Sequence, residues 1–321
     1  MKMTLLYIVL AALMAAYGST GQAPASETTA PAEQAAINHS AFDGNGAYEL
    51  TRQQCEFGPR VPGTPAHAQC ADWLIQSLQA SCDTVILQTG TVQTAKSGKL
   101  GIKNIIGIIN PDASQRLLLM AHWDTRPWAD NDPDPANHSK PVMGANDGAS
   151  GVGVLLQLAK QLRADSTSLG VDILLVDAED MGITDNDESW ALGAQYWAQH
   201  PHVAGYKPLF GILLDMVGAS DATFTREYFS VQYAGGFVDA VWNCAAGDHF
   251  VNSQGGAITD DHVFVNKAGI PCIDIIDMRT DSETGFCSVW HTVNDTMDGI
   301  SATTLGEVGQ TLINVISELE K

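Results

Sequence analysis

Histidine and acidic side chains in five separate segments of this sequence could together bind a metal ion. Imidazole and carboxylate ligands without a thiolate suit a catalytic zinc that keeps one position open for water or substrate. We therefore predict one metal-dependent active site, assembled from distant parts of the chain. The candidate residues are His122, Asp147, Glu179, Asp180, Asp215 and His291.

The adjacent acids Glu179 and Asp180 carry most of the weight of this prediction. Neighbouring carboxylates on a tight turn can divide their roles, because one can bind the metal while the other transfers protons beside it. A single acid at a strand end, such as Asp177, is more often a cap or a solvated group. An isolated histidine such as His249 more often lies at the surface. The set as a whole therefore indicates a metal site.

The segments around these residues have the pattern of an α/β fold. Short apolar runs with the length and flanks of buried parallel strands alternate with stretches of helical periodicity. This alternation predicts a three-layer α/β/α fold with a central mixed, mostly parallel twisted sheet. The predicted strands cover 104–109, 117–121, 171–176, 210–214 and 271–276, and the predicted helices cover 64–78, 151–162, 190–199 and 302–319.

Three of the predicted strands end immediately before a candidate ligand or its neighbour. His122 follows one strand, Asp177 follows the next and Asp215 follows a third. In open parallel sheets the site lies outside the carboxyl ends of the strands. We therefore expect these residues to meet at one edge of the sheet, with Asp147 and His291 joining them from other segments.

An ordered series of motifs resembles peptidase family M28, the zinc aminopeptidases. The series comprises HWD at 122–124, GANDGASG at 144–151, DAED at 177–180, Asp215 and WHT at 290–292. The resemblance extends from about Gly58 to the end of the chain. It implies the fold of the zinc aminopeptidases for a single catalytic domain.

A narrower set of motifs resembles the glutaminyl cyclases of the same superfamily. It includes GPRVPGTP at 58–65, LDMVGA at 214–219, ITDDH at 258–262 followed by GIP at 269–271, and Trp290 directly before His291. One position departs from the family pattern, because Asp180 stands where these proteins usually have glutamate. Aspartate is one methylene shorter but remains a competent oxygen ligand.

The cyclase resemblance implies one Zn²⁺ held by Asp147, Asp180 and His291. The substrates would be peptides or proteins with N-terminal glutamine, converted to pyroglutamate with release of ammonia. Glu179 would act as base and then as acid. Asp260, hydrogen-bonded to Glu179, would tune this proton transfer.

The same resemblance suggests roles for residues around the metal. Asp215 would steady the amide nitrogen, and His122 would lie behind the metal ligands. The apolar wall of the substrate pocket would be formed by Trp190, Ile258, Phe286 and Trp290.

Two other functions fit the sequence less well. A two-zinc aminopeptidase would use His122 and Asp215 for a second Zn²⁺, Asp147 as a bridge and Glu179 to activate water. Both histidine and aspartate are present, so ligand identity alone does not exclude it. A non-catalytic binding domain would have lost ligands or the base, and all of them are present. The acidic segment at 258–262 and Trp290 favour the cyclase.

Composition limits the partners and the compartment. A formal net charge of −21 argues against nucleic acid or an anionic membrane surface, and it suits substrates with a positive end. The apolar run at 5–16 is too short to span a bilayer but suits a signal peptide. We expect a signal peptide at 1–20, a disordered linker at 21–41 and the catalytic domain at 42–321. The mature protein would be a periplasmic or secreted monomer without a stable membrane insertion.

The six cysteines show no metal-binding spacing. Cys70 and Cys82 are close enough in sequence to pair, but buried thiols are an equal alternative. Tyr17 and Gly18 stand where a lipoprotein would need a cysteine, so no lipid anchor is expected.

Overall fold

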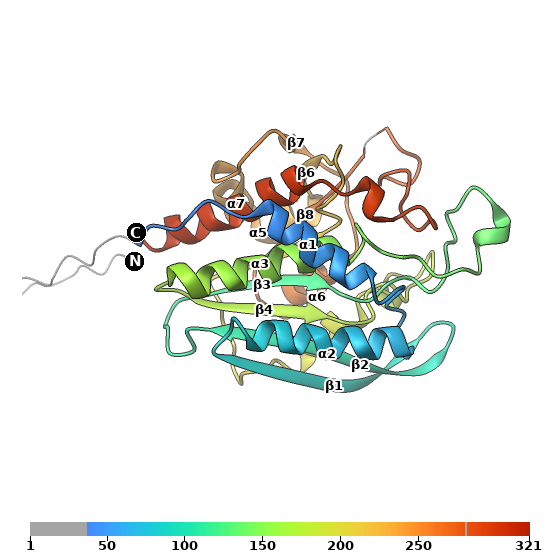
Figure 1. Cartoon of the computed structure of the whole chain (residues 1–321), viewed down its shortest axis with the longest axis horizontal. Coiled ribbons are helices and arrows are strands. Elements are labelled where there is room, and N and C mark those ends of the chain that lie inside the picture. Colours follow the sequence, from blue (N-terminus) through green and yellow to red (C-terminus); the bar gives the residue numbers. More distant parts are fainter. Residues whose placement is uncertain (1–36, 280) are drawn as a thin grey trace, which may run out of the picture. The chain divides into compact units, whose positions relative to one another are not determined.

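The computed structural model describes residues 37–279 and 281–321 (Figure 1). The predicted signal peptide, and the predicted linker up to residue 36, lie outside the described residues. Within them, no helix has the length and apolar character needed to cross a membrane. The end of the predicted linker contacts the domain, since His39 Nε2 lies 2.7 Å from Glu320 Oε2 and Ser40 N donates to Asp165 Oδ2.

A six-stranded sheet forms the centre of the domain, in the order β1-β2-β4-β3-β5-β8. Strands β4, β3, β5 and β8 run parallel to one another, and β2 is antiparallel to both its neighbours. The predicted mixed, mostly parallel sheet is therefore confirmed. The strands are β1 Thr84–Thr94, β2 Gly98–Ile109, β3 Arg116–His122, β4 Gly170–Val176, β5 Gly211–Asp215 and β8 Cys272–Ile276.

The prediction for the run at 104–109 was wrong in one respect. It forms a strand, but an antiparallel one that begins already at Gly98. The reason is the short connection at 95–97 between β1 and β2, because a tight turn can join only antiparallel strands. The other four predicted strands lie in the parallel part of the sheet.

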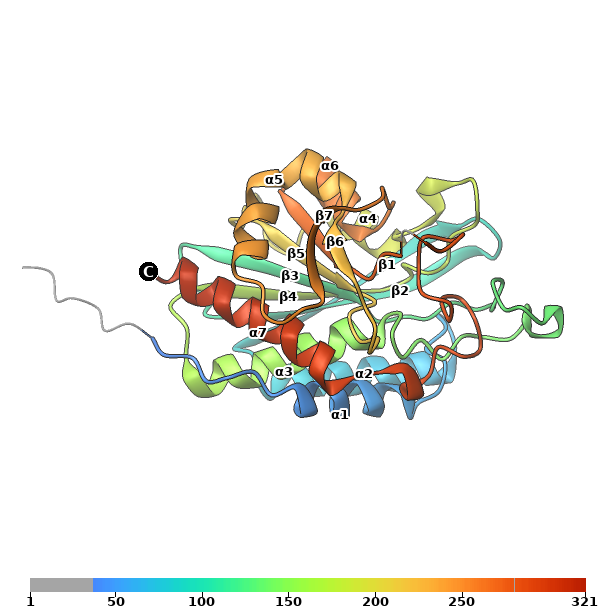
Figure 2. The ribbon, with the colours of Figure 1, turned by 90° about the horizontal axis from the view of Figure 1, so that it is seen from above.

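Helices cover both faces of the sheet, which confirms the three-layer architecture. Figure 2 shows α1, α2, α3 and α7 on one side and α4, α5 and α6 on the other. Helix α5 packs against the edge strand β8. The helices are α1 Gly44–Cys55, α2 Pro65–Gln79, α3 Ala149–Asp165, α4 Leu192–Gln199, α5 Tyr228–Asn243, α6 Asp261–Lys267 and α7 Ala302–Leu319.

Alternate residues of each central strand enter two separate apolar cores. In β3, Leu117, Leu119 and Ala121 pack towards α1, α2, α3 and α7. Leu118 and Met120 pack towards α4 and α6. Burial on both faces explains why the sequence shows continuous apolar runs here rather than alternation.

Short elements connect this framework. Strands β6 Phe224–Arg226 and β7 Phe250–Gln254 form a separate parallel pair. In the described part of the chain, three short 3₁₀ helices span Pro135–Asn137, Asp187–Ser189 and Met297–Gly299. None of the six cysteines is paired, and Cys70 and Cys82 are buried free thiols.

Candidate metal centre and substrate pocket

The carboxyl ends of three parallel strands bring candidate residues together as predicted. His122 ends β3, the segment 177–180 follows β4, and Asp215 ends β5. His122 Nε2 lies 2.9 Å from Asp147 Oδ1 and 3.1 Å from Asp215 Oδ1.

Asp147, Asp180 and His291 form a group that could hold one metal ion. One ligand atom from each lies within 4.8 Å of the other two, and all three side chains are buried. His291 Nε2 is 3.1 Å from Asp180 Oδ1 and 3.6 Å from Asp147 Oδ2. Two carboxylates and one imidazole match the donor set of a catalytic zinc with an open position.

A second group of possible ligands shares Asp147 with the first. His122, Asp147 and Asp215 also offer atoms within 4.8 Å of one another. Asp147 could therefore bridge two metal ions, as a two-zinc arrangement requires. In the structure His122 instead contacts both carboxylates directly.

Asp147 is held by a second carboxylate that sequence reasoning missed. Asp295 accepts hydrogen bonds from the backbone N–H of Asn146 at 2.8 Å and of Asp147 at 3.1 Å. Burial, followed by the charge of Asp147, raises the pKa of Asp295 to about 7. Burial and the charge of Asp180 raise the pKa of Asp147 to about 6. A divalent cation would relieve this repulsion, so the residues fit a metal ion.

The turn that carries the adjacent acids is fixed in a similar way. Asp124 accepts the backbone N–H of Glu179 at 3.0 Å and of Asp180 at 3.2 Å. Ala178, in this turn, has a φ of 57°, and Met216 and His291 have φ values of 49° and 56°. Positive φ in non-glycine residues costs about 1–3 kcal/mol and concentrates at functional sites. Each of these three residues is a candidate ligand or adjoins an acid of the site.

Arg126, which does not line the pocket, binds Asp180. Its Nη1 lies 3.2 Å from Asp180 Oδ1, and its Nε and Nη2 donate to the two oxygens of Asp130 at 2.7 and 2.6 Å. Although burial alone would raise the pKa of Asp180, His291 and Arg126 hold it below the usual range. No sequence pattern indicated Arg126, because Asp180 is 54 residues away and an aspartate four residues from an arginine, as at Asp130, is a common arrangement.

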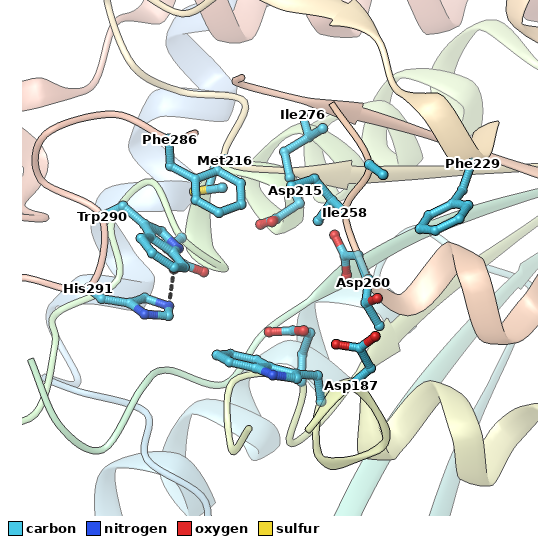
Figure 3. Close-up of a pocket in the computed structure, with 15 residues that line it drawn as sticks. Asp187, Asp215, Met216, Phe229, Ile258, Asp260, Ile276, Phe286, Trp290 and His291 are labelled. Atoms are coloured by element: carbon cyan, nitrogen blue, oxygen red, sulfur yellow. Dashed lines mark ion pairs between the residues drawn. The ribbon is translucent and has the colours of Figure 1, made fainter. Parts of the chain in front are cut away.

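A cavity of about 430 Å³ opens beside these groups (Figure 3). The Phe286 and Trp290 rings lie 4.4 Å apart, and Trp290 stacks on His291 at 3.7 Å. The structure places all the predicted wall residues, Trp190, Ile258, Phe286 and Trp290, around this cavity. It adds Met216, Phe229, Ile276 and Asp187, which sequence reasoning missed.

Glu179 lines the cavity and belongs to neither group of possible metal ligands. Burial, then the negative charge of Asp260, raises the pKa of Glu179 well above its usual range. A buried carboxyl of high proton affinity beside a metal centre can accept and return a proton.

The expected hydrogen bond between Asp260 and Glu179 stays a prediction. Asp260 Oδ1 accepts the backbone N–H of Asp261 as the N-cap of α6, and its Oδ2 has no partner among the described residues. Asp260 therefore caps a helix, and its charge, after burial, raises the pKa of Glu179. Asp215 also lines the cavity, with Oδ1 directed to His122.

Solved structures with this fold carry related descriptions. A glutaminyl cyclase from Porphyromonas gingivalis is 48% identical with a TM-score of 0.85, covering 87% of this chain and 99% of that one. A Zn-dependent exopeptidase from Parabacteroides distasonis is 45% identical with a TM-score of 0.85 and the same coverage. A bovine (Bos taurus) protein named glutaminyl-peptide cyclotransferase is 24% identical over 287 residues, covering 79% of this chain and 76% of its own length.

The fold and the carboxylate–imidazole centre define an α/β protein of the zinc exopeptidase type. A family model described as Peptidase family M28 matches residues 104–316. The chain belongs to peptidase family M28.

Replacing Arg126 by methionine tests its role behind Asp180. The side chain of Arg126 is only 2% exposed, so its loss leaves two acids without their cation. We expect a loss of about 3–5 kcal/mol in the free energy of unfolding, measured by urea denaturation with a chelator present. The control is Arg163→Met, whose side chain is 62% exposed and pairs with Asp83. The Arg163 change should lower the free energy of unfolding by less than about 1 kcal/mol. Equal losses of unfolding free energy in the two variants would contradict the role assigned to Arg126.

Proposed function

We propose that this protein is a zinc-dependent glutaminyl-peptide cyclotransferase. It converts the N-terminal glutamine of peptides and proteins to pyroglutamate and releases ammonia. The observation that carries the proposal is the position of Glu179, a buried carboxyl outside both ligand groups, on the wall of a cavity that also holds the Asp147, Asp180 and His291 group. The glutaminyl cyclases among the similar structures support it.

The residues of the site suit an intramolecular ring closure. Zinc held by Asp147, Asp180 and His291 would act as a Lewis acid on the γ-carbonyl of glutamine. Glu179 takes a proton from the α-amine as the nitrogen bonds to the γ-carbon. It then gives a proton to the γ-amide nitrogen as that carbon–nitrogen bond breaks and ammonia leaves. Both reacting groups belong to one residue, so orientation supplies much of the rate.

Other side chains support this proton transfer. The charge of Asp260 raises the proton affinity of Glu179, as its pKa shift indicates. Asp215, on the cavity wall, would accept a hydrogen bond from the amide nitrogen. Trp290 and Phe286 form an apolar wall that excludes water from the glutamine side chain.

A two-zinc aminopeptidase is the second candidate. It is favoured by the group His122, Asp147 and Asp215, which could hold another ion, and by relatives described as Zn-dependent exopeptidases. Trp290 and Asp260, which line the cavity, have no required part in that hydrolysis. We therefore prefer the cyclase.

Incubation with a Gln-initiated peptide should release ammonia without releasing free amino acids. Glu179→Gln should lower kcat by at least about 100-fold, because general acid–base catalysis contributes that much, while zinc stays bound. Coupled ammonia detection measures kcat, and mass spectrometry of the peptide distinguishes cyclisation from release of an amino acid. Release of the N-terminal amino acid would support the aminopeptidase instead, and full activity of the variant would refute the role of Glu179.

The metal content distinguishes the two candidates independently of turnover. We expect about one zinc per chain, held by three protein ligands. Asp180→Ala and His291→Ala should lose it, whereas His122→Ala should retain it. Elemental analysis after dialysis against trace zinc makes the comparison. A content near two, or loss of metal in His122→Ala, would favour the two-zinc enzyme.

We further propose that the catalytic domain is exported and works as a monomer. The basis for export is the apolar run at 5–16 that follows Lys2. The intact mass of the protein recovered from its native compartment should lack about the first 20 residues, and light scattering should give the mass of one chain. Full-length protein in the cytoplasm would contradict export.

A further inference from the structure

A shell of ionisable side chains lies buried behind the substrate pocket, and the mechanism above uses only one of them. Asp260 precedes α6, Asp261 and His262 begin it, Asp274 lies in β8, and Glu227 caps α5. Asp260 is 3% exposed and the other four are fully buried. Four buried acids and one histidine would carry a net negative charge if all were ionised, and burying that charge is costly unless protons or cations neutralise it.

Glu227 is fully accounted for as an ionised carboxylate. Despite burial, hydrogen bonding to His262 and to backbone N–H groups lowers the pKa of Glu227. His262 Nε2 lies 3.1 Å from Glu227 Oε2. The Glu227 carboxylate also accepts hydrogen bonds from the backbone N–H groups of Phe229, Ser230 and Ile258 and from the Ser230 hydroxyl.

Asp274 has no such partners. Neither of its carboxyl oxygens has a hydrogen-bond donor, and no lysine or arginine pairs with it, among the described residues. The nearest ring atom, His262 Nδ1, lies 3.6 Å from Asp274 Oδ2 and is itself without a hydrogen-bond partner. Asp260 Oδ2 is unpartnered as well. An oxygen of Asp260, a nitrogen of His262 and an oxygen of Asp274 lie within 4.8 Å of one another.

Either a proton or a bound cation could neutralise this cluster, and the geometry favours the proton. The group comprises three side chains, whereas a structural zinc takes four protein ligands. All three side chains are at most 3% exposed, and only Asp260 lines the cavity, so few water molecules could complete a coordination shell. A proton shared between two facing carboxyls needs no further ligand.

We propose that Asp274 is a neutral, protonated acid that donates its hydrogen to Asp260 and thereby holds the Asp260 carboxylate ionised beside Glu179. In this role Asp274 is a positioning residue that acts through Asp260, which reaches the cavity (Figure 3). The functional part of this inference rests on the proposed cyclase activity.

The surroundings of Asp274 are consistent with a bound proton. Burial, then the charges of Asp260, Asp215 and Glu227, raises the pKa of Asp274 well above its usual range. A donated hydrogen bond stabilises the charged form of the acceptor. Burial raises the pKa of Asp260 as well, and the hydrogen bond donated by Asp274 offsets this effect, so that Asp260 keeps the negative charge that raises the proton affinity of Glu179.

The protonation state of Asp274 is tested by thermal unfolding of the metal-loaded protein between about pH 4 and pH 7. An acid that stays protonated when folded but ionises when unfolded loses stability as pH rises above about 4. Asparagine mimics the neutral acid without this loss. Asp274→Asn should therefore match the parent near pH 4 and exceed its Tm by about 2 °C or more at pH 7.

Glu227→Gln is the matched control from the same shell. Because Glu227 is ionised when folded, its contribution is present at neutral pH and is lost as pH falls. The Tm deficit of this variant should be largest at pH 7 and shrink towards pH 4, opposite in sign to Asp274→Asn. If Asp274→Asn shows the same pattern as Glu227→Gln, fails to fold, or differs from the parent by an amount independent of pH, the proposal is overturned.

Activity on a Gln-initiated peptide tests the link to Asp260. Asp274→Asn should keep kcat within about three-fold of the parent, because its amide also donates to Asp260, whereas Asp274→Leu should lose at least about ten-fold in kcat with little change in KM. Equal kcat losses in both variants would contradict the positioning role. The unfolding curves need no turnover, so failure of the cyclase proposal leaves the protonation result readable. A second metal ion that disappears in Asp274→Asn would establish a cation site instead.

Discussion

The site depends on the mutual repulsion of buried carboxylates brought together at one edge of the sheet. Asp147, Asp180, Asp215 and Glu179 are each at most 9% exposed. Several negative charges in one buried volume are costly unless cations or protons neutralise them. The protein answers this in three ways: a centre suited to a divalent ion, the guanidinium of Arg126, and carboxyls with raised pKa values.

A second set of acids holds the backbone of the turns that carry the site carboxylates. Asp124 and Asp295 accept backbone N–H groups at the turns that carry Glu179 and Asp147. Their side chains thus position the peptide backbone rather than the metal. Neither turn can relax away from the centre without leaving these carboxylates unpaired, which costs about 1–3 kcal/mol or more for each. The ligand positions are therefore set before any ion or substrate binds.

Much of the framework could be predicted from sequence because parallel strands buried on both faces leave continuous apolar runs. Once β3 and β5 were placed, His122 and Asp215 had to meet at the same sheet edge. The hairpin β1–β2 was missed because the exposed edge strand Thr84–Thr94 carries many polar residues. Its direction followed from the turn at 95–97, which Gly98 closes with a φ of 76°.

The supporting residues were harder to predict than the ligands. Arg126 and Asp295 reach the site through partners 54 and 148 residues away, and no local sequence pattern indicates such pairings. No helix was predicted at 258–262, but Asp260 caps α6 and His262 lies inside that helix. Its helix is short, with only seven residues, and most of its faces are buried, so it shows no amphipathic period.

X-ray diffraction at the zinc absorption edge, on crystals grown with zinc, tests the convergence of these segments most directly. We expect one anomalous peak, from a zinc ion bound by Asp147, Asp180 and His291, with the Glu179 carboxylate beside the ion but not bound to it. A second peak between His122 and Asp215, or a single peak bonded to other residues, would contradict this account.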